Sequence, residues 1–66
     1  MDISLNGEIK HVPETCTIAT LLAQLDLTAK RLAVEVNLDI VPRSQFDEHV
    51  LHVGDKVEIV HAIGGG

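Results

Sequence analysis

The chain has 66 residues, enough for one compact domain and too few for a second. A domain of this size buries about 60% of the surface that its unfolded chain exposes, so it has too few residues to form both a sizeable core and a deep enclosed pocket. We therefore expect a protein that is not a self-sufficient enzyme.

The charge balance is acidic, with ten Asp and Glu against five Lys and Arg and a formal net charge of −5. Nucleic acid is not an expected partner, because phosphate binding needs a clustered basic surface and single-stranded bases need aromatic side chains to stack on. Phe46 is the one aromatic residue of the sequence. A partner with a basic surface fits this composition better.

The single cysteine, Cys16, cannot form an internal disulfide, whereas small secreted domains usually carry several. The sequence has neither a recognisable export signal nor 18 consecutive apolar residues. We expect a cytoplasmic protein without a membrane partner.

Residues 1–12 predict a β-hairpin. Two alternating segments flank Asn6-Gly7, a dipeptide favoured in two-residue type I′ turns because both residues tolerate positive φ. From residue 18 to about residue 26 the apolar spacing predicts one amphipathic helix, with Thr17 or Thr15 as its N-cap. The helix residues expected to pack in the core are Ile18, Leu21, Leu22 and Leu25.

The middle of the chain predicts a strand over residues 32–36, followed by a break and a short extended segment that stops at Pro42. Residues 44–49 then suggest a short helical turn capped by Ser44, with Phe46 and Val50 pointing inward. Val50 and Leu51 are candidates for a brief strand of their own.

The last segment, residues 57–63, alternates again. Val57, Ile59 and Ile63 fall on one side, and Glu58, Val60 and Ala62 on the other. The element order predicts an α+β fold of the β-grasp (ubiquitin-like) type, a mixed sheet of four or five strands with one main helix across it, in which the first and last strands pair in parallel at the centre. We assign residues 1–63 to this domain.

Three glycines, Gly64, Gly65 and Gly66, follow the predicted domain. Glycine loses more conformational freedom on ordering than any other residue, so these residues predict a flexible C-terminal tail. No Lys-Ser or Lys-Thr follows them, which excludes a phosphate-binding loop. The reactive group that remains is the α-carboxylate of Gly66, on an arm narrow enough to enter another enzyme's active site.

Other reactive side chains give weaker patterns. His49 and His52 are spaced like metal ligands but lack the four donors of a structural zinc site, so we expect no metal. The neighbouring Asp47-Glu48-His49 run is expected to be a solvated turn. Cys16 has no evident base to activate it and is expected to be packed and inert.

Val60 and Ala62 would face outward on the central strand, beside Ala33. A small apolar patch on an open sheet is a candidate docking surface, although isolated exposed apolar residues are also ordinary. Both interpretations stay open at this point.

The chain as a whole resembles the ThiS family of sulfur-carrier proteins of thiamin biosynthesis. The resemblance covers the entire length. Its elements, in order, are Ile3-Ser4-Leu5-Asn6-Gly7, the helical stretch 17–25, Val34-Glu35-Val36-Asn37, Ile40-Val41-Pro42-Arg43, the Gly54-Asp55 turn and the terminal glycines.

The resemblance implies that the carboxylate of Gly66 is adenylated by a ThiF-type adenylyltransferase that uses ATP and is then converted to a thiocarboxylate. A ThiG-type thiazole synthase would take up the sulfur to build the thiazole ring. Gly64 and Gly65 would be recognised as the tail, although the family pattern needs only two terminal glycines. The chain itself would be a reusable substrate with no bound cofactor.

Two alternatives share the predicted fold and tail. One is the small subunit of molybdopterin synthase, although such subunits tend to be longer. The other is a ubiquitin-like protein modifier, in which Gly66 would end in an isopeptide bond to a lysine.

Overall fold

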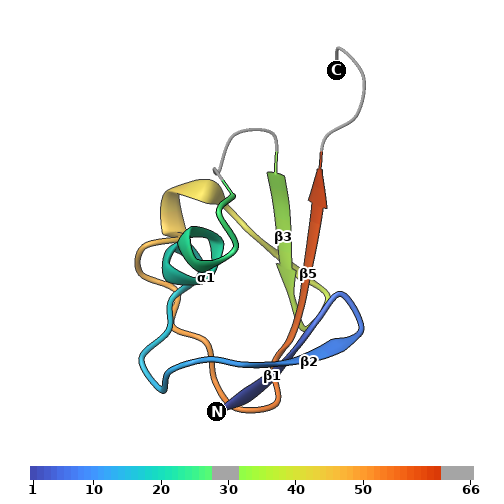
Figure 1. Cartoon of the computed structure of the whole chain (residues 1–66). Coiled ribbons are helices and arrows are strands. Elements are labelled where there is room, and N and C mark those ends of the chain that lie inside the picture. Colours follow the sequence, from blue (N-terminus) through green and yellow to red (C-terminus); the bar gives the residue numbers. More distant parts are fainter. Residues whose placement is uncertain (28–31, 62–66) are drawn as a thin grey trace.

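The computed structural model describes residues 1–27 and 32–61. Within these residues five strands form one mixed sheet in the order β2-β1-β5-β3-β4, accompanied by one α-helix and one 3-10 helix (Figure 1). The elements are β1 (Asp2–Leu5), β2 (Glu8–His11), α1 (Ile18–Gln24), β3 (Leu32–Val36), β4 (Asp39–Val41), η1 (Arg43–Gln45) and β5 (Lys56–His61). The predicted α+β architecture, a β-grasp, is confirmed.

The first and last strands lie together at the centre of the sheet. β1 and β5 pair in parallel, with Ser4 opposite Lys56 and Leu5 opposite Val57. On its other side β5 pairs antiparallel with β3 along five residue pairs, from Leu32–His61 to Val36–Val57. The strand that leads toward the glycines is therefore an inner strand, as the sequence predicts.

Two tight turns connect the outer hairpins. Asn6 and Gly7 have φ values of 49° and 86°, as the predicted type I′ turn requires. Asn37 and Leu38 join β3 to β4 with φ values of 53° and 74°, so the break predicted there is a second two-residue turn. Leu38 occupies a backbone region that side chains with a Cβ rarely adopt.

The helix begins where the sequence places it and ends earlier. Thr17 is the N-cap, and its hydroxyl accepts a hydrogen bond of 3.1 Å from the Thr20 backbone N–H. The predicted end near Asp26 is wrong by two residues, because α1 ends at Gln24 and Asp26 has a φ of 59°. Leu25 is consequently half-buried rather than a full core residue.

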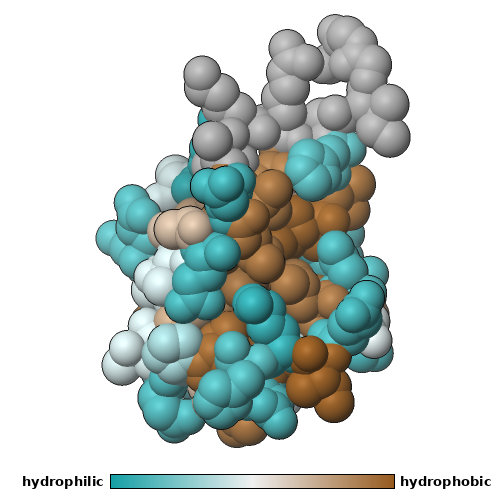
Figure 2. Space-filling model, viewed as in Figure 1, coloured by the Kyte–Doolittle hydropathy of each residue, from teal (hydrophilic) through white to brown (hydrophobic). Residues whose placement is uncertain are grey.

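The core lies between α1 and the face of the sheet that the helix covers. Figure 2 shows hydrophobic side chains in the middle of one side of the molecule, with hydrophilic ones around them. The buried residues are Ile3, Val12, Cys16, Ile18, Leu21, Leu22, Val34, Val36, Val41, Phe46, Leu51, Val57 and Ile59.

The segment after Pro42 differs from the prediction. A 3-10 helix spans Arg43–Gln45, and its N-cap is Pro42 rather than Ser44. Phe46 is buried as expected, but Val50 is 42% exposed and forms a single bridge with Thr17 in place of a strand. Leu51 fills the inward position, because the bridge directs alternate side chains of this segment to opposite sides.

None of the helices in the described part of the chain has both the length and the apolar character that crossing a bilayer requires.

Candidate functional site

The site predicted from sequence lies where β5 ends. The strand runs to His61, and both Ala62 and the glycines 64–66 lie outside the described residues. What the structure describes is the end of β5 to which this segment is attached. At this end β5 is paired with β3, up to Leu32–His61, whereas its parallel pairing with β1 stops at Leu5–Val57.

The outer face of the sheet, opposite α1, carries Val60. This side chain is 55% exposed, and Val60 pairs with Ala33 of β3, which is also exposed. The neighbouring Ile59 is 8% exposed, so the predicted alternation of buried and exposed residues along β5 is confirmed. Ala62, the second residue predicted for the docking surface, lies outside the described residues.

An acidic pair and a further apolar side chain adjoin Val60 on this face. Glu58 of β5 lies directly opposite Glu35 of β3, and Glu35 in turn pairs with Ile40 of β4. Ile40 is 71% exposed. Like charges at directly opposed positions are unfavourable in a sheet. We call Ala33, Glu35, Ile40, Glu58 and Val60 the outer-face patch. It offers an apolar surface with negative charge at its centre.

Asn6 holds the same strand from the other side. Its side-chain Oδ1 accepts a hydrogen bond of 2.8 Å from the Ile59 backbone N–H, and its Nδ2 donates one of 3.4 Å to the Ile59 carbonyl. Sequence reasoning assigned Asn6 to the turn alone. The sequence signal for this second role is that Asn6, with its amide side chain, directly follows a predicted strand.

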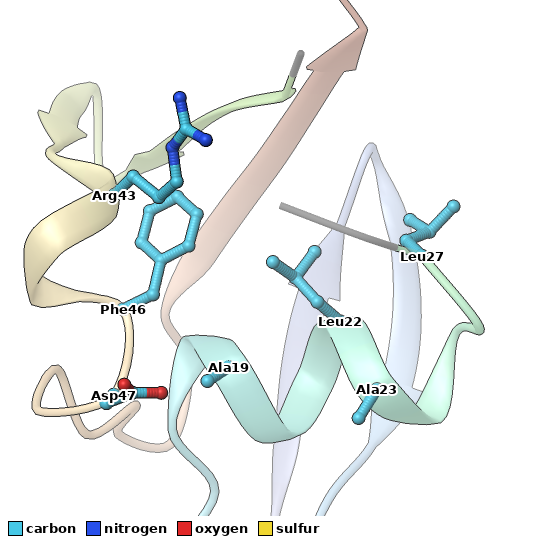
Figure 3. A pocket seen from close by; sticks show the side chains of 7 residues that line it. All are labelled: Ala19, Leu22, Ala23, Leu27, Arg43, Phe46 and Asp47. Atoms are coloured by element: carbon cyan, nitrogen blue, oxygen red, sulfur yellow. The ribbon is translucent and has the colours of Figure 1, made fainter. Parts of the chain in front are cut away.

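A groove lies between α1 and the segment after β4 (Figure 3). Leu22 and Leu27 line it on the helix side and Phe46 with Arg43 on the other, and its volume is about 270 Å³. Sites for small molecules usually hold about 300–1,000 Å³ and several convergent polar groups. Only Arg43 and Asp47 bring charge here, and neither adjoins a nucleophile in the lining.

Cys16 is buried, at 1% exposure, and its Sγ lies 3.4 Å from the carbonyl oxygen of Thr17, to which it donates. Burial raises the pKa of the Cys16 thiol, and the positive charge of Lys10 offsets this only in part. A buried, protonated thiol is a poor nucleophile. The prediction of a packed cysteine is confirmed.

The polar residues around His49 are dispersed. Asp47 and Glu48 are exposed, as expected of a solvated turn. In residues 1–27 and 32–61 no group of three or more His, Cys, Asp or Glu side chains is placed to hold a metal ion. His49 and His52 line one hollow with Asp39, Glu48 and Asp55, but among the described residues these side chains form no group that could hold a metal ion.

These features define a small ubiquitin-like domain whose central strand leads to a glycine-rich end and whose outer sheet face lies opposite α1. The chain belongs to the ThiS family, whose sequence profile matches residues 3–66. It is 40% identical to the sulfur carrier protein ThiS of Bacillus subtilis, over 97% of this chain and 98% of that protein.

Two further relatives place the domain in context. The chain is 41% identical over its whole length to part of a thiazole synthase of Paramagnetospirillum magneticum, and it spans 20% of the length of that protein. A crystal structure of the thiamine biosynthesis protein ThiS of Geobacter metallireducens superimposes with a TM-score of 0.88 at 32% identity, with both chains fully covered. The same domain thus matches both a separate small protein and one segment of a much longer chain.

Proposed function

We propose that this protein is a sulfur carrier of thiamin biosynthesis that works in the cytoplasm. The observation that carries the proposal is the full-length match to a protein named as a sulfur carrier, at 40% identity. The groove beside α1 is consistent with it, because Arg43 and Asp47 are the charged side chains of an otherwise apolar lining that holds no nucleophile. The chemistry is assigned to Gly66 instead.

In this proposal the α-carboxylate of Gly66 is the reacting group. A carboxylate is a poor acyl donor because its oxygen is a poor leaving group, so a ThiF-type adenylyltransferase must activate it. One carboxylate oxygen attacks the α-phosphorus of ATP, a C–O–P linkage forms and pyrophosphate leaves. A sulfur nucleophile then adds to the carbonyl carbon and AMP departs, which leaves a thiocarboxylate. ATP is thus used by the partner, and the carrier binds no cofactor.

The acceptor of the sulfur is proposed to be a ThiG-type thiazole synthase. The support is the relative of that name, in which a segment similar to this whole chain makes up 20% of the protein. Joining a carrier to the enzyme that it serves raises the effective concentration of one for the other. A separate carrier would make the same contact between two chains.

The outer-face patch is the proposed docking surface for the activating partner, together with Ala62. Val60 and Ile40 supply apolar area, and Glu35 and Glu58 supply negative charge that a basic side chain of the partner would neutralise. A bidentate arginine fits two neighbouring carboxylates well. Gly64 and Gly65 would then follow into the active site as the recognised tail.

The test is an intact-mass measurement after the protein is incubated with ATP, a ThiF-type enzyme and a sulfide source. The expected product has one oxygen replaced by one sulfur, located on Gly66 by fragmentation. Omission of ATP is the control and should leave the mass unchanged. Covalent ladders in a pull-down under denaturing conditions would instead indicate a protein modifier.

A further inference from the structure

The parallel ladder between β1 and β5 stops before β5 does. The backbone N–H groups of Ser4 and Asn6 donate to the carbonyls of Asp55 and Val57, each at 2.9 Å. In a parallel pair that continued, the next rung would join Ile59 to the carbonyl of residue 6 and the N–H of residue 8. The turn at Asn6-Gly7 removes that rung, because the chain reverses there into β2.

The Asn6 side chain takes the place of the missing rung. A primary amide presents the same two groups as a peptide unit, one carbonyl acceptor and one N–H donor. Oδ1 stands in for the carbonyl at 2.8 Å from the Ile59 nitrogen, and Nδ2 stands in for the N–H at 3.4 Å from the Ile59 oxygen. The second bond is the longer and weaker one. The N–H and the carbonyl of Ile59 are thereby both paired, two residues before β5 ends.

We propose that Asn6 is a positioning residue that holds the tail-side end of β5 in the sheet, so that the segment beyond His61 is presented to the partner from a fixed point. This role rests on the proposed carrier function. A strand end that detaches from the sheet must be ordered again when the partner binds, and that ordering weakens binding. Loss of the Asn6 amide should therefore affect recognition more than the chemical step.

The second hairpin supplies a matched control. Asn37 has nearly the same φ as Asn6, 53° against 49°, and also begins a two-residue turn. Its side chain likewise makes two hydrogen bonds of 3.0 Å, from the Lys56 N–H and to Asp55. These bonds hold the start of β5, whereas those of Asn6 hold its tail-side end. Glycine accepts positive φ at either position, so Asn6→Gly and Asn37→Gly each remove two side-chain hydrogen bonds, at opposite ends of one strand.

The experiment combines amide hydrogen exchange of the free protein with kinetics of ATP–pyrophosphate exchange by the activating enzyme. For Asn6→Gly we expect the Ile59 amide to exchange up to about tenfold faster than in the wild type, the size of one lost hydrogen bond. We expect KM for the carrier to rise by a similar factor while kcat stays within about twofold. Asn37→Gly should leave both the Ile59 exchange and KM near wild-type values.

Unchanged Ile59 exchange in Asn6→Gly would overturn the proposal, as would a KM that rises equally in the two glycine variants or not at all. If Asn6→Gly fails to fold, Asn6→Asp replaces it, since this variant keeps the acceptor but sets a carboxylate in place of the donor. It should also raise KM. If the wild type itself supports no pyrophosphate exchange, the carrier function is what fails, and the Ile59 exchange comparison alone decides whether Asn6 anchors β5.

Discussion

The two faces of the sheet are built from alternate residues of the same strands and have opposite surroundings. On the inner face Ile3, Val34 and Val57 are at most 2% exposed beneath α1. On the outer face Val60 and Ile40 are 55% and 71% exposed. The inner face therefore provides the apolar burial that stabilises the fold. The outer face contributes little burial, so its residues are available for a partner.

Substitution on the side of α1 that packs against the inner face should have the largest effect on folding. Leu22→Ala removes a side chain that is 3% exposed, and large-to-small changes at such sites cost about 2–5 kcal/mol. The half-buried Leu25 should cost less when changed to Ala. Chemical denaturation of the two variants measures the difference. If both variants unfold like the wild type, the inner face has been assigned wrongly.

Substitution on the outer face should separate binding from stability. Val60→Asp introduces a charge that stays solvated in the free domain but is buried without a partner in the complex, so affinity for the activating enzyme should fall at least about tenfold. The midpoint of thermal unfolding should change little. Val53→Asp is a suitable control, since Val53 is 73% exposed in the turn before β5, outside the outer-face patch. Wild-type affinity of a folded Val60→Asp protein would remove Val60 from the docking surface.

The buried Cys16 of the core also predicts a dependence of stability on pH. Because burial raises the pKa of the Cys16 thiol, the folded protein keeps its proton at pH values where the unfolded chain, with a thiol pKa of about 8.5, has lost it. The free energy of unfolding should therefore be unaffected below that pH and fall as pH rises above it. The sequence contains no tyrosine to titrate in the same range. Denaturation curves across this pH range measure how the free energy of unfolding depends on pH. If a Cys16→Ala variant shows the same dependence, groups other than the Cys16 thiol cause it.

The acidic pair of the outer face should give the smallest effect on stability. Glu58→Lys replaces the repulsion across from Glu35 with an attraction, which should stabilise the domain by about 0.2–1 kcal/mol. The same change should weaken binding to the activating enzyme, since it removes charge that the partner is proposed to neutralise. A variant that is both more stable and equally well bound would show that the pair has no part in docking.

Much of this fold is readable from local patterns. The Asn6-Gly7 hairpin, the N-cap at Thr17 and the alternation of Val57, Ile59 and Val60 each depend on residues close in sequence. The element order then leaves few ways to bury the helix stripe. For that reason the class of the fold can be predicted from local patterns and element order alone.

The errors arise where contacts distant in sequence decide the outcome. Val50 is turned outward by its bridge to Thr17, 33 positions earlier. No local sequence pattern predicts this bridge. Asn6 and Ile59 are 53 positions apart, so the second role of Asn6 needs the strand pairing to be known. The facing of Glu35 and Glu58 likewise depends on the register of β3 against β5.

The central claim is that the reactive group is the carboxylate of Gly66 and not a side chain. An alanine added after Gly66 shifts the carboxylate by one residue and places a Cβ where the activating site should receive glycine, while the described core is untouched. Intact mass after reaction with ATP, the ThiF-type enzyme and sulfide should then show little or none of the oxygen-to-sulfur replacement. Matched Cys16→Ala and Asp47→Asn proteins should show it in full. Thiocarboxylate formed as readily on the extended protein, with the alanine still present, would contradict the account.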